Sequence, residues 1–223
     1  MRNKICTFIL NIFLLIILFS GNLSAQIPQW EKQIENDPSN KELLIKLGKA
    51  YHDLAGENED NEAVKKAEKY LSKLLEIEPN HALAMAYYGS VLTMKARDAF
   101  FPWEKMKYMK KGFARMDSAV VLDHDEPEVR LIRAINGTLV PKMFNRLKLA
   151  LSDFNYIAGL EKEKLDEMTN KFWLPYYFYF GLALEKDEQL QAAREKFAKV
   201  IELDSNADLA NKVRQQLENM KNE

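Results

Sequence analysis

The stretch from Tyr176 to Asn206 constrains the fold of this chain most strongly, because two amphipathic helical patterns follow each other there with a short polar turn between them. The residues that recur at helical spacing are Tyr177, Phe180, Gly181 and Leu184, then Ala193, Phe197, Val200 and Ile201. Gly181 and Ala193 place one small residue in each helix, and small side chains let two helix backbones approach closely. The stretch therefore predicts a tightly packed helical hairpin.

The order of a large apolar residue, Gly, Ala and an aromatic residue resembles a tetratricopeptide repeat, a helical hairpin with a period of about 34 residues. We expect about four such repeats, at residues 41–80, 82–125, 127–160 and 174–206, with capping helices at 26–36 and 207–223. The resemblance implies an all-α fold, a right-handed solenoid in which stacked hairpins cover one another's apolar faces. No segment alternates like a strand over more than a few residues, so we expect residues 26–223 to form a single helical-repeat domain.

Two segments depart from the repeat pattern. The acidic stretch from Gly56 to Glu62 is longer than the turn of a repeat needs. We interpret it as a solvated loop, because it lacks the residue order of an EF-hand calcium loop. In the third repeat, Arg130 and Arg133 stand where the family prefers apolar residues.

Residues 1–25 have the order of an export signal. Arg2 and Lys4 form a basic start, an almost continuously apolar run covers residues 5–19, and small or polar residues lead to Ala25. We predict cleavage after Ala25 and an exported protein that is periplasmic or secreted. The alternative is an uncleaved anchor in the inner membrane, although the apolar run is shorter than the ~20 residues that a membrane span needs.

The chain from Gln26 onward shows no residue pattern for catalysis, metal binding or cofactor binding. Cleavage removes Cys6, the only cysteine, and two basic residues, so the net charge changes from −1 to −3. A mildly acidic surface argues against nucleic-acid binding. His52, His81 and His124 form no metal-site pattern such as H-E-x-x-H, and the chain lacks a Gly-rich phosphate loop and a G-x-S-x-G motif. We expect a protein that is not an enzyme and has no cofactor.

In the family, the first helices of successive repeats line a concave groove that holds a peptide or a partner helix. Counting from the small core residue of each repeat, we expect this face to carry Ile45, Lys49, His52, Ser90, Met94, Leu131, Ile135, Phe178 and Leu182. Relatives that bind acidic peptide tails carry a clamp of Lys, Arg and Asn in the groove, and here only Lys49 resembles it. The later positions are apolar, so an acidic tail is not the expected ligand.

Two apolar inserts interrupt the second and third repeats between their helices. The first contains Phe100, Phe101 and Trp103, and the second contains Met143 and Phe144. The favoured interpretation is that the inserts fold back into the groove and become part of the core. The alternative is that they rim an open apolar pocket or a docking patch, because a large exposed apolar area usually marks a binding site.

These observations support three functional hypotheses. The first is an exported, non-catalytic scaffold that binds a protein or peptide partner in the cell envelope. The second is a carrier or sensor of an apolar small molecule held in the groove under the inserts. The third is a structural module that self-associates through its ends.

Overall fold

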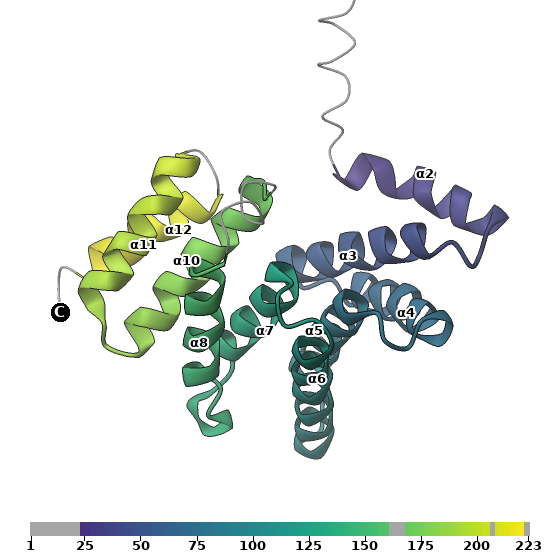
Figure 1. The fold of residues 1–223 in the computed structure, drawn as a ribbon, viewed down its shortest axis with the longest axis horizontal. Helices are drawn as coiled ribbons and strands as arrows, with labels where there is room; N and C mark the ends of the chain where they lie inside the picture. The colour runs from purple at the N-terminus through teal and green to yellow at the C-terminus, as the bar shows by residue number, and fades with distance from the viewer. Residues whose placement is uncertain (1–22, 161–167, 206–207, 221–223) are drawn as a thin grey trace, which may run out of the picture. The chain divides into compact units, whose positions relative to one another are not determined.

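The computed structural model describes residues 23–160, 168–205 and 208–220, and these residues are helical apart from turns and short connections (Figure 1). No strand occurs among them. The all-α fold predicted from the repeat pattern is therefore confirmed. The predicted export signal, residues 1–25, lies outside the described residues except for its last three, which begin the first described helix.

The chain divides into two compact units, whereas the sequence led us to expect one domain. Unit 1 ends at Ile77 and contains α2 (Leu23–Asn36), α3 (Lys41–Asn58) and α4 (Asn61–Ile77). The helices of unit 2 are α5 (Ala82–Asp98), α6 (Pro102–Leu122), α7 (Pro127–Leu139), η1 (Lys142–Phe144), α8 (Leu147–Ala158), α10 (Asn170–Lys186), α11 (Leu190–Leu203) and α12 (Asp208–Asn219). The division falls beside Pro79, which disfavours helical backbone at the residue before it and so ends α4.

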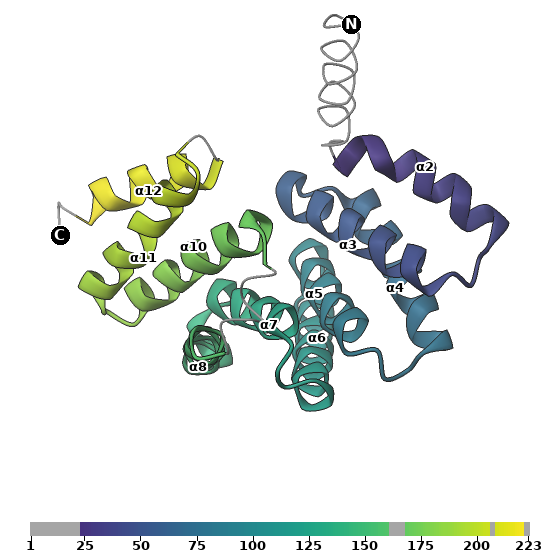
Figure 2. The same cartoon turned by 45° about the horizontal axis from the view of Figure 1, so that its top comes forward.

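Each predicted repeat contains one helical hairpin. The pairs are α3 with α4, α5 with α6, α7 with α8, and α10 with α11, and the two members of each pair pack side by side in both views (Figures 1 and 2). Helix α2 packs against α3, and α12 packs against α11 and α10. In unit 2 the first helices also contact one another, α5 with α7 and α7 with α10.

The acidic stretch that we expected to form a long loop is mostly helical. Helix α3 continues to Asn58 and α4 begins at Asn61, so only Glu59 and Asp60 connect them. Glu59 has a left-handed backbone with φ of 52°, and Asp60 accepts hydrogen bonds from the Glu62 and Ala63 backbone nitrogens at 2.8 and 3.2 Å. Asp60 thus satisfies free N–H groups at the start of α4, which is why the turn can be this short.

Glycines set how closely paired helices approach. In the α5–α6 hairpin a Cβ at Gly89 would lie 2.7 Å from the Gly112 carbonyl oxygen, and one at Gly112 would lie 2.6 Å from the Gly89 oxygen. In the α10–α11 hairpin a Cβ at Gly181 would lie 2.5 Å from Cε1 of Phe197. All three distances are too short for a real contact. The prediction that small residues permit close helix packing is therefore confirmed.

Glu31 ties α2 to both other helices of unit 1. Its Oε1 accepts hydrogen bonds from the Tyr51 hydroxyl on α3 at 2.7 Å and from Lys66 Nζ and the Tyr70 hydroxyl on α4 at 3.0 and 3.3 Å. Burial raises the pKa of Glu31, but the hydrogen bonds from Tyr51 and Lys66 outweigh it and the pKa is lowered overall. Burial also raises the pKa of Tyr70, to about 12. The ionised carboxylate of Glu31 therefore holds α2 on the α3–α4 hairpin.

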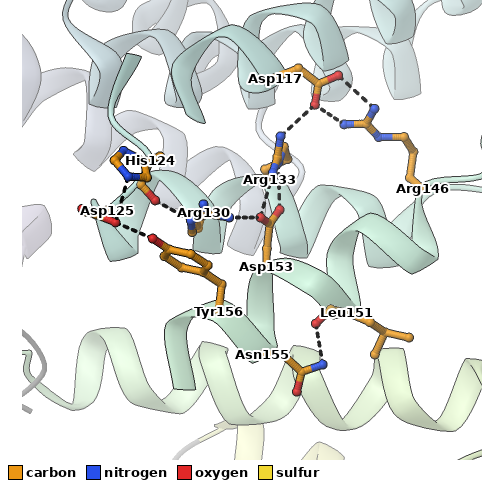
Figure 3. A network of polar contacts seen from close by, with 10 residues as sticks. All are labelled: Asp117, His124, Asp125, Arg130, Arg133, Arg146, Leu151, Asp153, Asn155 and Tyr156. Atoms are coloured by element: carbon orange, nitrogen blue, oxygen red, sulfur yellow. Dashed lines mark hydrogen bonds and ion pairs between the residues drawn. The ribbon is translucent and has the colours of Figure 1, made fainter. Parts of the chain in front are cut away.

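Arg130 and Arg133 of α7 occupy predicted apolar positions because the partner helix carries a buried carboxylate opposite them (Figure 3). Arg130 Nη1 donates to Asp153 Oδ1 at 2.8 Å, while Arg133 Nε and Nη2 donate to Oδ2 and Oδ1, both at 2.7 Å. Asp153 lies on α8 and is 0% exposed. Both of its oxygens are thus paired with arginine.

A second carboxylate extends this cluster to α6 (Figure 3). Asp117 accepts a hydrogen bond from Arg133 Nη1 at 3.3 Å and two from Arg146, from Nη1 at 3.0 Å and Nη2 at 2.5 Å. Burial lowers the pKa of Arg133, but Asp153 and Asp117 outweigh it and the pKa is raised overall. The buried guanidinium therefore stays charged and links α6, α7 and α8.

The far end of the cluster fixes the connection between α6 and α7. Arg130 Nε donates to the His124 carbonyl oxygen at 2.5 Å, and the guanidinium carbon lies 3.5 Å from the centre of the Tyr156 ring. The Tyr156 hydroxyl in turn donates to Asp125. Since these charged and polar groups form hydrogen bonds and ion pairs with one another, we interpret the cluster as structural.

We expect Gly89→Ala to lower the melting temperature, even though alanine is normally the better helix former. The new Cβ meets a backbone carbonyl that cannot rotate away, and such overpacking costs about 1–3 kcal/mol, or roughly 2–10 °C for a chain of this size. Far-UV circular dichroism measures the change. Gly159→Ala is the control, because its Cβ would have no neighbour nearer than 3.6 Å. Equal melting of the two variants would contradict the close-packing argument.

We expect Glu31→Gln to destabilise unit 1 at neutral pH and to have almost no effect at low pH. A carboxylate with a lowered folded pKa stabilises the fold above its unfolded pKa of about 4.3, and this contribution is lost as the pH falls through the folded pKa. Urea unfolding followed at Trp30, with the other two tryptophans replaced by Phe, compares the variants at neutral pH and near pH 3. Glu35→Gln, an exposed change on the same helix, should show no such pH-dependent difference.

We expect Asp153→Asn to be the more damaging of two matched substitutions in the charged cluster. It leaves two buried guanidinium groups without their shared counter-charge, which costs about 3–5 kcal/mol. Asp117→Asn removes the same charge from a residue whose side chain is 40% exposed, where water compensates and the loss is about 1 kcal/mol or less. Denaturant unfolding separates the two, and a larger loss for Asp117→Asn would show that Asp153 does not anchor the cluster.

Candidate functional site

The predicted groove positions divide between the two units. Ile45, Lys49 and His52 lie on α3 of unit 1, and all three side chains are half-buried. His52 Nδ1 lies 3.1 Å from Asp53 Oδ1, its neighbour in the chain. These residues thus form a partly accessible surface of mixed polarity on α3.

In unit 2 the structure corrects part of the predicted groove. Ser90, Leu131 and Phe178 are buried, with 3%, 5% and 7% of their surfaces exposed. Leu131 and Phe178 belong to the hydrophobic core of α7, α8, α10, α11 and α12. The reason is that neighbouring helices occupy these positions. Ser90 accepts a hydrogen bond from Asn136 of α7, and the Phe178 ring lies 6.2 Å from the Phe197 ring of α11.

A small polar cluster lies at the contact between α5 and α7. Asn136 Nδ2 donates to the Ser90 hydroxyl at 3.0 Å and to the Ile132 carbonyl oxygen at 2.9 Å. The Thr93 hydroxyl lies 2.6 Å from Asn136 Oδ1 and 2.7 Å from the Ser90 carbonyl oxygen. Ser90 therefore helps to join two helices, and it is not available as a ligand-binding hydroxyl.

Three other predicted positions keep part of their surface accessible. Met94 on α5, Ile135 on α7 and Leu182 on α10 are half-buried, one on each of three successive first helices of unit 2. Ile135 and Leu182 also pack against the hydrophobic core. The partly accessible surface at these three positions is therefore apolar, and none of the three supplies a Lys, Arg or Asn for a clamp.

The first apolar insert is exposed, which contradicts the favoured prediction that it fills the groove. Phe100 is 86% exposed, Trp103 is 65% exposed and Phe101 is 42% exposed. The insert is short because Pro102 occupies the first turn of α6, where its fixed φ favours helix initiation. Only the residues from Ala99 to Phe101 connect the two helices, so the segment cannot reach back over the groove.

The second insert has two different parts. Met143 is 72% exposed, whereas Phe144 is half-buried and packs edge-on against Phe113 of α6 with 5.5 Å between ring centres. The Arg146 guanidinium lies 4.8 Å from the same Phe113 ring. Phe144 therefore packs against α6, a second helix, and not in the predicted groove, while Met143 is largely exposed.

Helix α6 carries a basic face that was not predicted from the sequence. Lys107, Lys110, Lys111 and Arg115 are all exposed on this helix. The net charge of the whole chain conceals them, because acidic residues elsewhere balance them. The charge of each helix taken separately would have revealed this face.

Within the described ranges, no group of three or more His, Cys, Asp or Glu side chains could hold a metal ion. None of the described helices combines the length and the apolar character that crossing a membrane requires.

Comparison with known proteins identifies the fold. No family model and no curated protein matches the sequence. Among solved structures, TTC0263, a thermophilic TPR protein of Thermus thermophilus, matches 91% of this chain and 94% of its own length, with 16% identity and a TM-score of 0.68. Two structures of MamA match 83% of this chain at 19% identity, covering 85% and 91% of their own lengths with TM-scores of 0.45 and 0.47. The likeness to TTC0263, together with the four hairpins and their close-packed glycines, shows that this chain has the tetratricopeptide-repeat fold.

Proposed function

We propose that this protein is a non-catalytic scaffold, exported to the cell envelope, that binds an apolar segment of a protein partner on the first helices of unit 2. Tetratricopeptide-repeat folds in general mediate protein–protein interactions, because stacked hairpins create extended binding surfaces. Export is proposed from residues 1–25 and their order of basic, apolar and small residues.

The observation that carries the proposal is the row of half-buried apolar side chains at Met94, Ile135 and Leu182. One such side chain lies on each of the first helices α5, α7 and α10. A partner that contacts all three therefore meets an apolar side chain in every repeat of unit 2. An amphipathic helix offers apolar residues at spacings of three and four residues, which suits a surface built from successive helices.

The alternative, a carrier of an apolar small molecule, required the inserts to cover the groove. Phe101 and Trp103 instead stack on each other and stay exposed, with 4.3 Å between their ring centres. The exposed first insert therefore favours the scaffold over the carrier.

A single introduced cysteine tests both halves of the proposal. Met94→Cys gives the mature chain its only thiol, because Cys6 lies within the predicted signal. We expect a thiol-reactive photo-crosslinker that does not cross the inner membrane to label this cysteine in intact cells of the native host and, after illumination, to join the chain to a partner protein. Mass spectrometry identifies the product.

Two controls separate export from partner binding. The wild-type chain should remain unlabelled, since its cysteine leaves with the signal. Gln191→Cys, on the exposed side of α11, should be labelled without yielding the crosslinked partner. Absence of label at both introduced cysteines would contradict export, whereas equal crosslinking from both would contradict binding at the first helices.

A further inference from the structure

We propose that the loop end of the α5–α6 hairpin docks on an anionic lipid bilayer surface. In this arrangement the rings of Phe100, Phe101 and Trp103 enter the interfacial layer of the bilayer. The exposed lysines of α6 lie behind them and face the lipid phosphates.

The three rings form a compact apolar tip. Phe101 stacks on Trp103 with 4.3 Å between ring centres and an angle of 15° between the planes. Phe100 meets Phe101 edge-on at 5.1 Å and 88°. Since Phe100 is 86% exposed and Trp103 is 65% exposed, the rings pack mainly on one another and leave a large apolar area in water. Aromatic rings of this kind, Trp above all, favour the boundary between water and lipid.

The lysines behind the tip share a helix face with Trp103. Lys107, Lys110 and Lys111 follow Trp103 by four, seven and eight residues, and these spacings return to the same side of an α-helix. All three are exposed, and none of them forms an ion pair with a carboxylate in the described part of the chain. At a rise of about 1.5 Å per residue they lie roughly 6–12 Å along the axis from Trp103.

The charge of this hairpin end suits an anionic surface. From Lys95 to Arg115 there are seven basic side chains against the acidic Asp98 and Glu104, whereas the whole chain has a net charge of −1. Asp98 accepts a hydrogen bond from Arg97 Nε at 2.7 Å, so Arg97 is partly neutralised. The Lys107, Lys110 and Lys111 ammonium groups stay available, and each Lys near an anionic surface strengthens binding.

The order of apolar and basic groups along the hairpin favours a bilayer over a protein partner. Aromatic rings come first, and cationic groups follow roughly 6–12 Å further along the helix, a distance comparable to the Debye length of about 8–10 Å. A bilayer presents the matching arrangement of layers, because an apolar layer lies beneath the anionic phosphates. This arrangement extends over an area much wider than the tip. A protein partner would need an apolar pocket surrounded by acidic side chains to offer the same match.

Fluorescence at Trp103 tests the proposal in the full chain. Trp30→Phe and Trp173→Phe leave Trp103 as the only tryptophan. In buffer we expect the emission of a solvated indole. With vesicles of phosphatidylcholine and phosphatidylglycerol we expect a shift to shorter wavelength and quenching by lipids brominated in the acyl chain. With phosphatidylcholine alone, or at high salt, the shift should be much smaller.

Charge reversal supplies the matched control. The triple change Lys107→Glu, Lys110→Glu and Lys111→Glu should lower the partition coefficient into anionic vesicles by more than about tenfold. The same charge change at three exposed lysines elsewhere in unit 2, namely Lys148→Glu, Lys171→Glu and Lys212→Glu, should leave it nearly unchanged. Circular dichroism confirms that both variants are folded, and both keep residues 1–25, so their comparison is independent of that segment.

Three results would overturn the inference. The Trp103 emission could stay unmoved by anionic vesicles in the folded chain. It could shift equally with neutral vesicles and with the Lys107, Lys110 and Lys111 reversal. It could also shift only when a soluble acidic protein or a nucleic acid is added, which would assign the hairpin end to a different class of partner.

Discussion

The close approach of two helix backbones within each hairpin is the constraint on which the rest of unit 2 depends. At Gly89 and Gly112 each helix occupies the space where a side chain of the other would lie. A first helix that is so close to its partner still has apolar residues on its other faces, and α5, α7 and α10 cover those by packing against one another. Helix α5 is accordingly apolar around most of its circumference, as expected of a helix surrounded by protein.

This packing decides which residues can serve a partner. It buries Ser90, Leu131 and Phe178 at contacts between helices, and it leaves Met94 and Leu182 only half-covered. Largely exposed aromatic rings occur instead at the hairpin end, where no described helix of unit 2 covers them. Position within the hairpin, more than residue type, therefore determines whether an apolar side chain stabilises the fold or is available for binding.

The sequence predicted the hairpins well because their signal is local: a small residue within an apolar stripe at helical spacing, as at Gly89 and Gly181. Helix ends were harder to place. Asp60 caps α4 and so shortens the acidic turn. Pro102 begins α6 and so shortens the first insert. Each of these effects depends on a single residue. The role of Asp153 was not predicted at all. Its pairing with an arginine 20 residues away is a property of the folded hairpin and produces no periodic pattern in the sequence.

The two groups of basic residues in unit 2 differ in a way that follows from their chemistry. The cluster around Asp153 and Asp117 uses arginine at all three cationic positions, since a planar guanidinium with several fixed donors can satisfy a buried carboxylate from more than one side. The exposed face of α6 is mostly lysine, a compact and strongly hydrated charge on a flexible stem. Fixed donors suit one defined partner inside the protein. Flexible, hydrated charges suit a surface whose anionic groups have no fixed positions, as the phosphates of a fluid bilayer do.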